Sequence, residues 1–404
     1  MRIVHIEEFF HPDAGYQVNM LSRIQAREGH RVTVIAAELE KMPSHLTAFF
    51  GKDEIERKDA EFEQSTGVRI IRLPVLCYYS GRAIFKSGLF KTVSATQPDV
   101  AFIHAMETLT GILFVWFSHR LNYPLVLDSH MLEMATRNRF SGAFRAFFRT
   151  FVTPKILREN IPTIRVVDTD YLQRHMRIPL ERTELLSFGT DTDHFRPDPP
   201  TRLKVRRQYG IHEDAFLVIY AGKLDEAKGG TFLAKAIQER FEPCRDNRQI
   251  EFLVIGNCDG QYGESVDRVL SASQNKLVRL PTQRYFDLAG FYQAADLAVY
   301  PRQCSLSFFD AHSCGLPVLF EENEINSQRA SNSGAVTFSP GNVSDFRRRL
   351  MELAALPSAD FELMRTNARN FVLKSYNYIP VAEHFNAVLK RAAINWRKHR
   401  QGGA

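Results

Sequence analysis

PRQCSLSFFDAHSCGLPVLF, residues 301–320, is the stretch from which the fold of this chain can be read. It follows a short apolar run, residues 297–300, and it ends in another, residues 318–320. Both runs are rich in β-branched or aromatic residues, which is typical of buried strands. Between them, residues 307–313 contain no helix breaker, and the Gly-Leu-Pro sequence that follows prevents the helix from continuing. The stretch therefore predicts a strand, a polar loop, a short helix and a second strand.

The polar loop of this unit, residues 302–305, lies where parallel sheets bind ligands. In an open α/β sheet the carboxyl ends of the strands lead into helix N-termini, and ligands bind at that edge. Backbone amides at a helix N-terminus favour anions, so this loop, the first helical turn and Asp310 could face a nucleotide or a sugar. A polar connection above a helix that packs on the sheet is the alternative that the stretch alone leaves open.

Length and composition indicate a globular protein of two domains. The 404 residues exceed one ordinary hydrophobic core, and 44% hydrophobic and 24% charged residues are usual proportions. The 52 Lys and Arg against 46 Asp and Glu leave a net charge of +6, a small excess, and we expect no nucleic-acid partner. Five cysteines, an odd number without metal-type spacing, suit a reducing cytoplasm. The sequence shows no leader pattern and no apolar run near the roughly 20 residues of a membrane span, so any membrane contact should be peripheral.

The first half of the chain alternates between strands and helices. We expect strands at residues 2–6, 32–36, 68–73, 100–104, 124–128 and 163–167. Helical segments separate most of these strands, which predicts a mostly parallel, doubly wound α/β sheet. The highly charged residues 40–64 should form an exposed excursion from this pattern.

The alternation then stops and starts again, which predicts a second sheet. Residues 185–197 form a Gly- and Pro-containing link, and we place the domain boundary there, giving domains 1–192 and 193–378. The second domain should contain strands at residues 216–221, 251–256, 276–280, 297–300 and 317–320. The chain should close with helices at 343–353, 359–374 and 380–397, and we expect residues 379–404 to return to the first domain.

Three features of these sheets could carry chemistry. His104 and His130 each follow a predicted strand at the ligand edge, although single histidines often have structural roles. Gly15 lies in the first strand-to-helix turn, where either a simple tight turn or a ligand-binding turn is possible. Residues 222–230, GKLDEAKGG, place Lys223 and Lys228 beside a helix N-terminus, a suitable position for a pyrophosphate. The spacing differs from that of a P-loop, and solvated surface lysines are the alternative.

Residues 137–155, RNRFSGAFRAFFRTFVTPK, interleave arginine with phenylalanine. Residues 82–91, RAIFKSGLFK, have a similar composition. Basic and aromatic residues at helical spacing suit a helix on an anionic membrane surface. The alternative is a helix that packs its phenylalanines into the core.

Four patches of the chain resemble retaining glycosyltransferases of family 4, which have the two-domain GT-B fold. Phe10, Pro12 and Gly15, followed by a helix and GHRVTVI, resemble the family's F-x-P-x-x-G opening. LSFGTDTDHFRP, residues 186–197, resembles PNGVDxxxFxP, and AGKLDEAKGG resembles the GRLxxxKG phosphate loop. Residues 291–318, which include most of the stretch 301–320, resemble the donor-site motif. The four patches occur in the family's order, and the resemblance extends over essentially the whole chain.

The resemblance implies a GT-B fold, with two Rossmann-like domains around a cleft and a C-terminal helix that returns to the first domain. It implies transfer of a hexosyl or N-acetylhexosaminyl group from a nucleotide sugar, UDP-linked in preference to GDP-linked, with retention at the anomeric carbon. The acceptor would be a glycan or a lipid-linked molecule, as in surface-polysaccharide, lipopolysaccharide or O-antigen assembly. No metal or other cofactor is expected, because Lys223 and Lys228 would neutralise the leaving diphosphate. We expect a cytoplasmic enzyme that is peripheral on the inner face of the plasma membrane.

The resemblance also assigns site residues. The expected catalytic residues are His104, His130, Lys223 and Lys228. The expected donor-binding residues are Gly15, Tyr16, Gly189, Gly222, Cys304, Ser305, Leu306, Ser307 and Asp310. Asp310 matches the second glutamate of the donor motif, and we expect it to hold the ribose diol.

The chain departs from the family at two positions. Cys304 stands where the first glutamate of the donor motif is usual, and Tyr16 replaces the second glycine of the opening. Two alternatives follow, a non-catalytic GT-B protein that binds a nucleotide or a partner enzyme, and a GT-B-type sugar-nucleotide epimerase.

Overall fold

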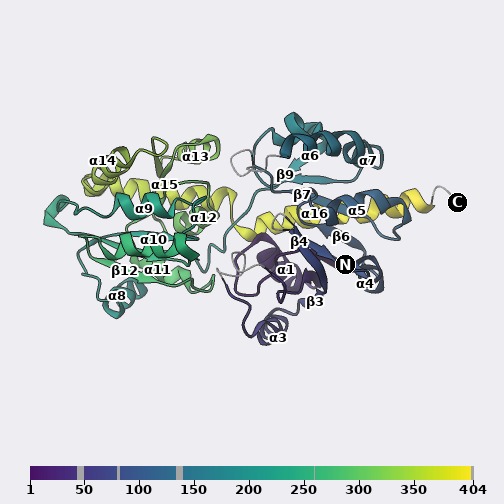
Figure 1. The fold of residues 1–404 in the computed structure, drawn as a ribbon, viewed down its shortest axis with the longest axis horizontal. Helices are drawn as coiled ribbons and strands as arrows, with labels where there is room; N and C mark the ends of the chain where they lie inside the picture. Colours follow the sequence, from purple (N-terminus) through teal and green to yellow (C-terminus); the bar gives the residue numbers. More distant parts are fainter. Residues whose placement is uncertain (43–49, 80–81, 133–139, 259, 402–404) are drawn as a thin grey trace. The chain divides into compact units, whose positions relative to one another are not determined.

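The chain folds into two compact α/β units in the computed structural model (Figure 1). The structure describes residues 1–42, 50–79, 82–132, 140–258 and 260–401. Unit 1 contains most of the first 188 residues together with Tyr378–Ala404, and unit 2 is formed by Gly189–Asn377. The division thus falls a few residues before the boundary that the sequence predicts.

Unit 1 is built on a parallel sheet of seven strands with the order β3-β2-β1-β6-β7-β8-β9. The strands are β1 (Arg2–Ile6), β2 (Arg31–Ala37), β3 (Arg69–Leu73), β6 (Val100–Ile103), β7 (Leu125–Ser129), β8 (Thr163–Arg165) and β9 (Thr183–Leu185). β1, β6 and β7 are almost completely buried because each carries a continuous run of mostly apolar residues, as parallel sheets require. The strand order reverses between β1 and β6, and ligands bind at such switch points.

Most α-helices of unit 1 connect its strands, and the last one closes the chain. They are α1 (Gln17–Arg27), α3 (Ile55–Thr66), α4 (Leu89–Ala95), α5 (Leu109–Phe117), α6 (Ser141–Phe147), α7 (Thr153–Arg158) and the C-terminal α16 (Tyr378–Gln401). α16 packs against α1, β6 and β7, with Phe385 and Leu389 buried. The predicted return of the last helix to the first sheet is therefore confirmed.

Unit 2 repeats the same plan with six parallel strands in the order β12-β11-β10-β13-β14-β15. The strands are β10 (Phe216–Ala221), β11 (Ile250–Ile255), β12 (Leu277–Leu280), β13 (Leu297–Tyr300), β14 (Val318–Glu321) and β15 (Ala335–Phe338). The helices are α8 (Pro199–Gln208), α9 (Gly230–Ala236), α10 (Gly260–Ser271), α11 (Leu288–Ala294), α12 (Ser307–Ser313), α13 (Glu324–Ala330), α14 (Val343–Ala354) and α15 (Ser358–Ser375). β13, its polar loop, α12 and β14 reproduce the unit that residues 297–320 predict.

Two predictions about unit 1 need correction. Residues 82–91 do not form a helix: Arg82–Phe85 is strand β5, paired antiparallel with β4 (Val75–Tyr79), and α4 begins only at Leu89. The β-branched and aromatic residues of these two segments favour the hairpin. The predicted excursion of residues 40–64 contains the start of α3, which buries Phe62 against Phe10 and so belongs to the core; its residues 43–49 lie outside the described part of the chain.

The segment 137–155 divides its phenylalanines between core and surface. Phe148 is completely buried, Phe144 and Phe147 pack partly against the core, and Phe140 and Phe151 are exposed. Arg137 and Arg139 lie outside the described residues. Among the helices that the structure describes, none combines the length and apolar character needed to cross a membrane.

Candidate functional site

The ligand edge of unit 2 is formed by two loops at its switch point. One loop follows β10 and runs from Gly222 to Gly230, and the other follows β13 and leads into α12. β10 and β13 are paired neighbours, so their carboxyl ends deliver both loops to the same place.

Close backbone packing explains the glycines of the first loop. A Cβ at Gly230 would lie 2.2 Å from the carbonyl oxygen of Leu224, a distance that no side chain permits. Gly229 has a φ of +80° and caps the N-terminus of α9. The loop therefore folds back on itself tightly before the helix starts, which the paired glycines allow.

Lys228 joins the two loops. Its ammonium donates a hydrogen bond to the backbone carbonyl of Cys304 (2.8 Å), and its own amide is bonded to Asp225 Oδ1 (2.8 Å). A second bridge runs in the opposite direction, from the Arg302 guanidinium to the carbonyl of Glu226 (2.9 Å). Desolvation by burial lowers the pKa of Lys228. A half-buried ammonium that faces a carbonyl is well placed to bind an anionic ligand, because its charge is poorly solvated.

Arg329, on α13, supports the second loop from behind. Its Nη1 donates to the carbonyl of Ser305 (2.8 Å), and its guanidinium lies over the rings of Phe308 and Phe309, 4.9 and 4.8 Å from their centroids. Only 9% of the residue is exposed. Burial lowers its pKa, yet a guanidinium stays charged, so Arg329 adds a fixed positive charge beside Lys228.

Asp310, on α12, is buried and already has partners within unit 2. Its Oδ1 accepts hydrogen bonds from Thr190 Oγ1 (2.6 Å) and the Tyr285 hydroxyl (2.8 Å), and neither bond uses Oδ2. Burial raises the pKa of this carboxyl to about 7. The predicted contact with a ribose diol would therefore depend on Oδ2.

The ligand edge of unit 1 carries a cluster around Asp128, the penultimate residue of the buried strand β7. His104 Nδ1 is hydrogen-bonded to Asp128 Oδ2 (2.8 Å), and the amide of Ala105 donates to Oδ1 (2.7 Å). His130 Nε2 lies 3.1 Å from the same Oδ1. The two histidines and their hydrogen bonds hold the pKa of Asp128 well below its usual range despite burial.

The two predicted histidines are not equivalent. His104 is only 3% exposed, and its second nitrogen, Nε2, is hydrogen-bonded to His5 Nδ1 (2.9 Å). The side chain of His130 is 31% exposed and lies beside Phe188, with ring centroids 5.5 Å apart. Of the two side chains, only that of His130 is exposed enough for a ligand to reach.

Glu107 adds a carboxyl to this cluster. The Ser129 hydroxyl donates a hydrogen bond to its Oε1, and burial raises its pKa to about 7. His104, Asp128 and His130 offer ligand atoms within 4.8 Å of one another, a spacing that a metal ion could use. Both nitrogens of His104 are engaged in hydrogen bonds, one to His5 and one to Asp128.

The remaining predicted residues lie in two regions. Gly15 and Tyr16 precede α1, with Tyr16 at its N-cap and 38% exposed. Gly222, Lys223, Leu306 and Ser307 lie in the unit 2 loops or at the start of α12, and Gly189 directly precedes Thr190, the partner of Asp310.

The structure places several further residues at or behind the two ligand edges that the sequence did not predict. They are His5, Gln25, Glu107, Asp128, Thr190, Tyr285 and Arg329. Asp128 and Glu107 lie next to predicted strand ends, a signal that could have identified them. Thr190, Tyr285 and Arg329 reach Asp310 or the second loop only through the tertiary fold, and no local pattern marks them.

Two family models match the chain, one on each unit. Residues 14–186 match the "Glycosyl transferase 4-like domain", and residues 215–355 match "Glycosyl transferases group 1". Each α/β unit thus matches a glycosyltransferase domain, and the fold is GT-B. The two matched ranges contain every site residue that the sequence predicts except Gly189.

Curated relatives and solved structures agree with this family. The D-inositol 3-phosphate glycosyltransferase of Frankia alni is 26% identical over 235 residues, which are 54% of this chain and 56% of the relative. The chain thus aligns with little more than half the length of this relative. A glycosyltransferase of Rickettsia africae ESF-5 superposes with a TM-score of 0.72 at 11% identity over 97% of this chain and 98% of that one. Anabaena HepE, solved with UDP and glucose, superposes with a TM-score of 0.70 at 15% identity. The match covers 97% of this chain and 100% of that one. These structures have the same fold.

Proposed function

We propose that the chain transfers a hexosyl or N-acetylhexosaminyl group from a nucleotide sugar to a glycan or lipid-linked acceptor, with retention of configuration. The observation that carries the proposal is the pair of cations, Lys228 and Arg329, that meet at the loop Cys304–Ser305 on the switch point of unit 2. Negative charge grows on the leaving diphosphate as the glycosidic bond breaks, and preorganised cations stabilise that charge.

UDP-sugars are the preferred donors in this proposal. The solved complexes of Anabaena HepE contain UDP and UDP-glucose, which supports a uridine nucleotide for a protein of the same fold. Lys223 and Lys228 would contact the diphosphate, Asp310 Oδ2 the ribose, and Ser305 and Ser307 the sugar in place of the missing first glutamate. His130 would accept a hydrogen bond from a hydroxyl of the transferred sugar.

No metal takes part in the proposed reaction. The two lysines would supply the positive charge that a metal ion supplies elsewhere. Transfer should therefore proceed at full rate in excess chelator, and activity that requires added Mg²⁺ or Mn²⁺ would contradict this part of the proposal.

An anionic membrane surface is the proposed partner of unit 1. Trp116, Phe147 and Phe151 form one aromatic cluster, with ring centroids 5.8 and 5.5 Å apart, and Trp116 and Phe151 are exposed. Arg158, with 73% of its side chain exposed, lies on the adjacent α7. Basic and aromatic groups on one surface suit a lipid headgroup region, which supports a peripheral protein that acts on a lipid-linked acceptor of surface-polysaccharide or O-antigen type at the cytoplasmic face.

A direct experiment separates this function from the alternatives. UDP- and GDP-sugars are first screened by thermal shift, and release of free nucleotide is then measured with and without candidate acceptors. Release that needs an acceptor and gives a glycosylated product supports transfer. Interconversion of the donor sugar without acceptor would indicate an epimerase, and donor binding without any turnover would indicate a non-catalytic protein.

A further inference from the structure

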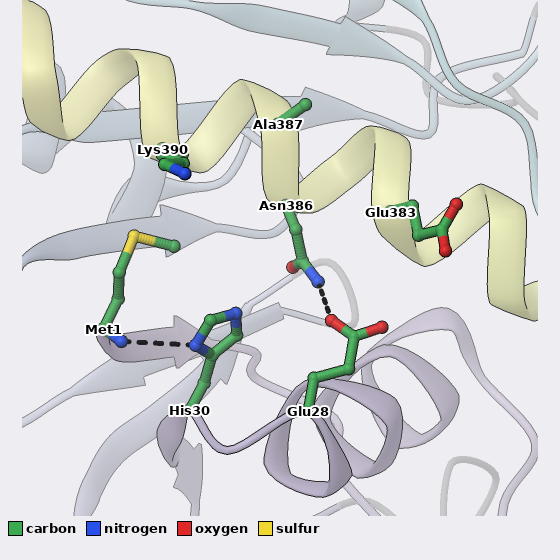
Figure 2. Close-up of a pocket in the computed structure, with 7 residues that line it drawn as sticks. All are labelled: Met1, Glu28, His30, Glu383, Asn386, Ala387 and Lys390. Atoms are coloured by element: carbon green, nitrogen blue, oxygen red, sulfur yellow. Dashed lines mark hydrogen bonds between the residues drawn. The ribbon is translucent and has the colours of Figure 1, made fainter.

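A continuous line of polar side chains enters unit 1 from the side of α16 and ends at Asp128. It begins at a surface hollow of about 410 Å³ lined by residues that include Glu28, Asn386 and Lys390 (Figure 2). Asn386 Nδ2 donates to Glu28 Oε2 (2.7 Å), and Gln25 Nε2 donates to Asn386 Oδ1 (2.8 Å). Gln25 Oε1 then meets His5 Nε2 (2.7 Å). We call Glu28, Asn386, Gln25 and His5 the polar relay.

The chemistry of the outer end fixes the direction of every bond in the relay. An ionised carboxylate only accepts, so the amide group of Asn386 that faces Glu28 must be its NH₂. Asn386 therefore presents its oxygen to Gln25, and Gln25 presents its own oxygen to His5. Because that oxygen cannot donate, His5 must carry a proton on Nε2.

This constraint determines the number of protons at the inner end. His5 Nδ1 and His104 Nε2 are 2.9 Å apart and share one hydrogen, and the bond between His104 Nδ1 and Asp128 Oδ2 contains another. Together with the proton on His5 Nε2, the two imidazole rings therefore hold three protons. Two neutral rings would hold only two, so the pair carries one positive charge beside the Asp128 anion. The charge resides on His104, because His104 touches Asp128 directly and His5 is completely buried. Burial and the neighbouring His104 also lower the pKa of His5 to about 3.

We propose that Gln25 and Asn386 are positioning residues that hold the His5–His104 pair in its cationic form, so that His104 neutralises Asp128 on the side away from His130. His130 then faces a carboxylate whose charge is already balanced. Without the relay, Gln25 or His5 can reverse, both rings become neutral, and the uncompensated Asp128 attracts a proton to His130. The other acidic groups that act on His130 are Glu7 and Glu107, and neither belongs to the relay.

The charge on His104 can be read without any substrate. We would record the ¹⁵N shifts of the imidazole nitrogens between pH 6 and 8, with the His104 signals assigned by their loss in His104→Gln. The proposal expects both His104 nitrogens to be protonated in the native protein. It expects Asn386→Leu and Gln25→Leu to convert His104 to a neutral ring protonated on Nδ1 alone. Glu383→Gln, an exposed variant that lines the same hollow outside the relay, is the control and should leave the cation in place.

The same variants test whether loss of the relay lets His130 bind a proton more readily. This test rests on the proposed function, because it is measured as activity. The Asn386→Leu variant should move the acid limb of the kcat/KM profile upward by about one pH unit, the scale for the loss of one compensating charge. A neutral His104 in the native protein, or a cationic His104 that survives both leucine variants, overturns the relay whatever the enzyme does. Because Asn386 is half-buried at the rim of the hollow, its variant gives a result even if Gln25→Leu fails to fold. If no transfer is found but the nitrogen shifts behave as expected, the relay stands and the proposed function fails.

Discussion

Lys228 and Cys304 are joined by a hydrogen bond that uses the backbone carbonyl of the cysteine and leaves its thiol out. The family carries a glutamate near this position, and the sequence alone left open whether the thiol had replaced its function. The geometry gives the lysine a role that is independent of the side chain at residue 304. The ammonium of Lys228 and the thiol of Cys304 can therefore be tested by separate substitutions.

Replacing Lys228 should remove a preorganised cation from the leaving group. We expect Lys228→Ala to lower kcat/KM with a nucleotide sugar by roughly 30- to 10³-fold, about 2–4 kcal/mol of transition-state stabilisation. Lys235→Ala, an exposed position on α9, is the matched control and should have no effect. An unchanged kcat/KM in Lys228→Ala would reject the phosphate role.

Changing the thiol of Cys304 should matter little. Because Lys228 binds the carbonyl, Cys304→Ser keeps the contact and should retain turnover within a few fold of the native rate. Loss of activity in Cys304→Ser would show that the thiol acts directly. If the native protein is inactive with every donor and Cys304→Glu creates activity, the non-catalytic alternative is correct.

Arg329 should be needed for donor binding although it is largely hidden. Arg329→Met keeps the volume and the contact with Phe308 and Phe309 but removes the charge and the bond to the Ser305 carbonyl. We expect donor affinity to fall about tenfold or more, since a charged hydrogen bond contributes roughly 1.5–3 kcal/mol. Isothermal titration with a UDP-sugar measures this effect, with the exposed Arg348→Met as control. Equal affinities in the two variants would contradict the role of Arg329.

The sequence predicts the strands of the fold better than the partners of the site residues. The strands around residues 297–320 were predictable, because their apolar runs, Gly315 and Pro317 act locally. The hairpin of Arg82–Phe85 was missed, because its basic and aromatic residues also fit an amphipathic helix and only pairing with β4 decides between them. Asp310 was predicted as a ligand contact, whereas its bonds to Thr190 and Tyr285 join residues 120 and 25 positions away. Such partners depend on the tertiary fold and leave no periodic signal in the sequence.

The buried carboxyl of Asp310 should make stability depend on pH. Its pKa is about 7 in the folded chain against 3.8 when exposed, so the native state binds the proton more tightly than the unfolded state. Stability should therefore fall as the pH rises from about 4 to about 7 and then level off.

Asp310→Asn keeps an oxygen for Thr190 and Tyr285 and cannot ionise. Relative to the native protein, this variant should gain roughly 2–4 kcal/mol of unfolding free energy between pH 5 and pH 8. Urea denaturation at both pH values measures the difference, and a constant difference would show that Asp310 is ionised throughout.

The aromatic cluster Trp116, Phe147 and Phe151 should determine whether unit 1 binds lipid. Phe151 is 60% exposed although its neighbour Phe148 is fully buried, so the surface position is not a by-product of core packing. Phe151→Ser should weaken binding to anionic vesicles, and Leu363→Ser, an equally exposed apolar residue on α15 of unit 2, should not.

Removing Arg149 and Arg158 together should weaken binding about 30-fold, because each basic side chain near such a surface contributes about 1 kcal/mol. Binding of the native protein should also fall steeply with salt, since the attraction is screened within a Debye length. Equal sedimentation with neutral and anionic vesicles would reject the membrane partner, and the cluster would then have to be explained by a contact with protein.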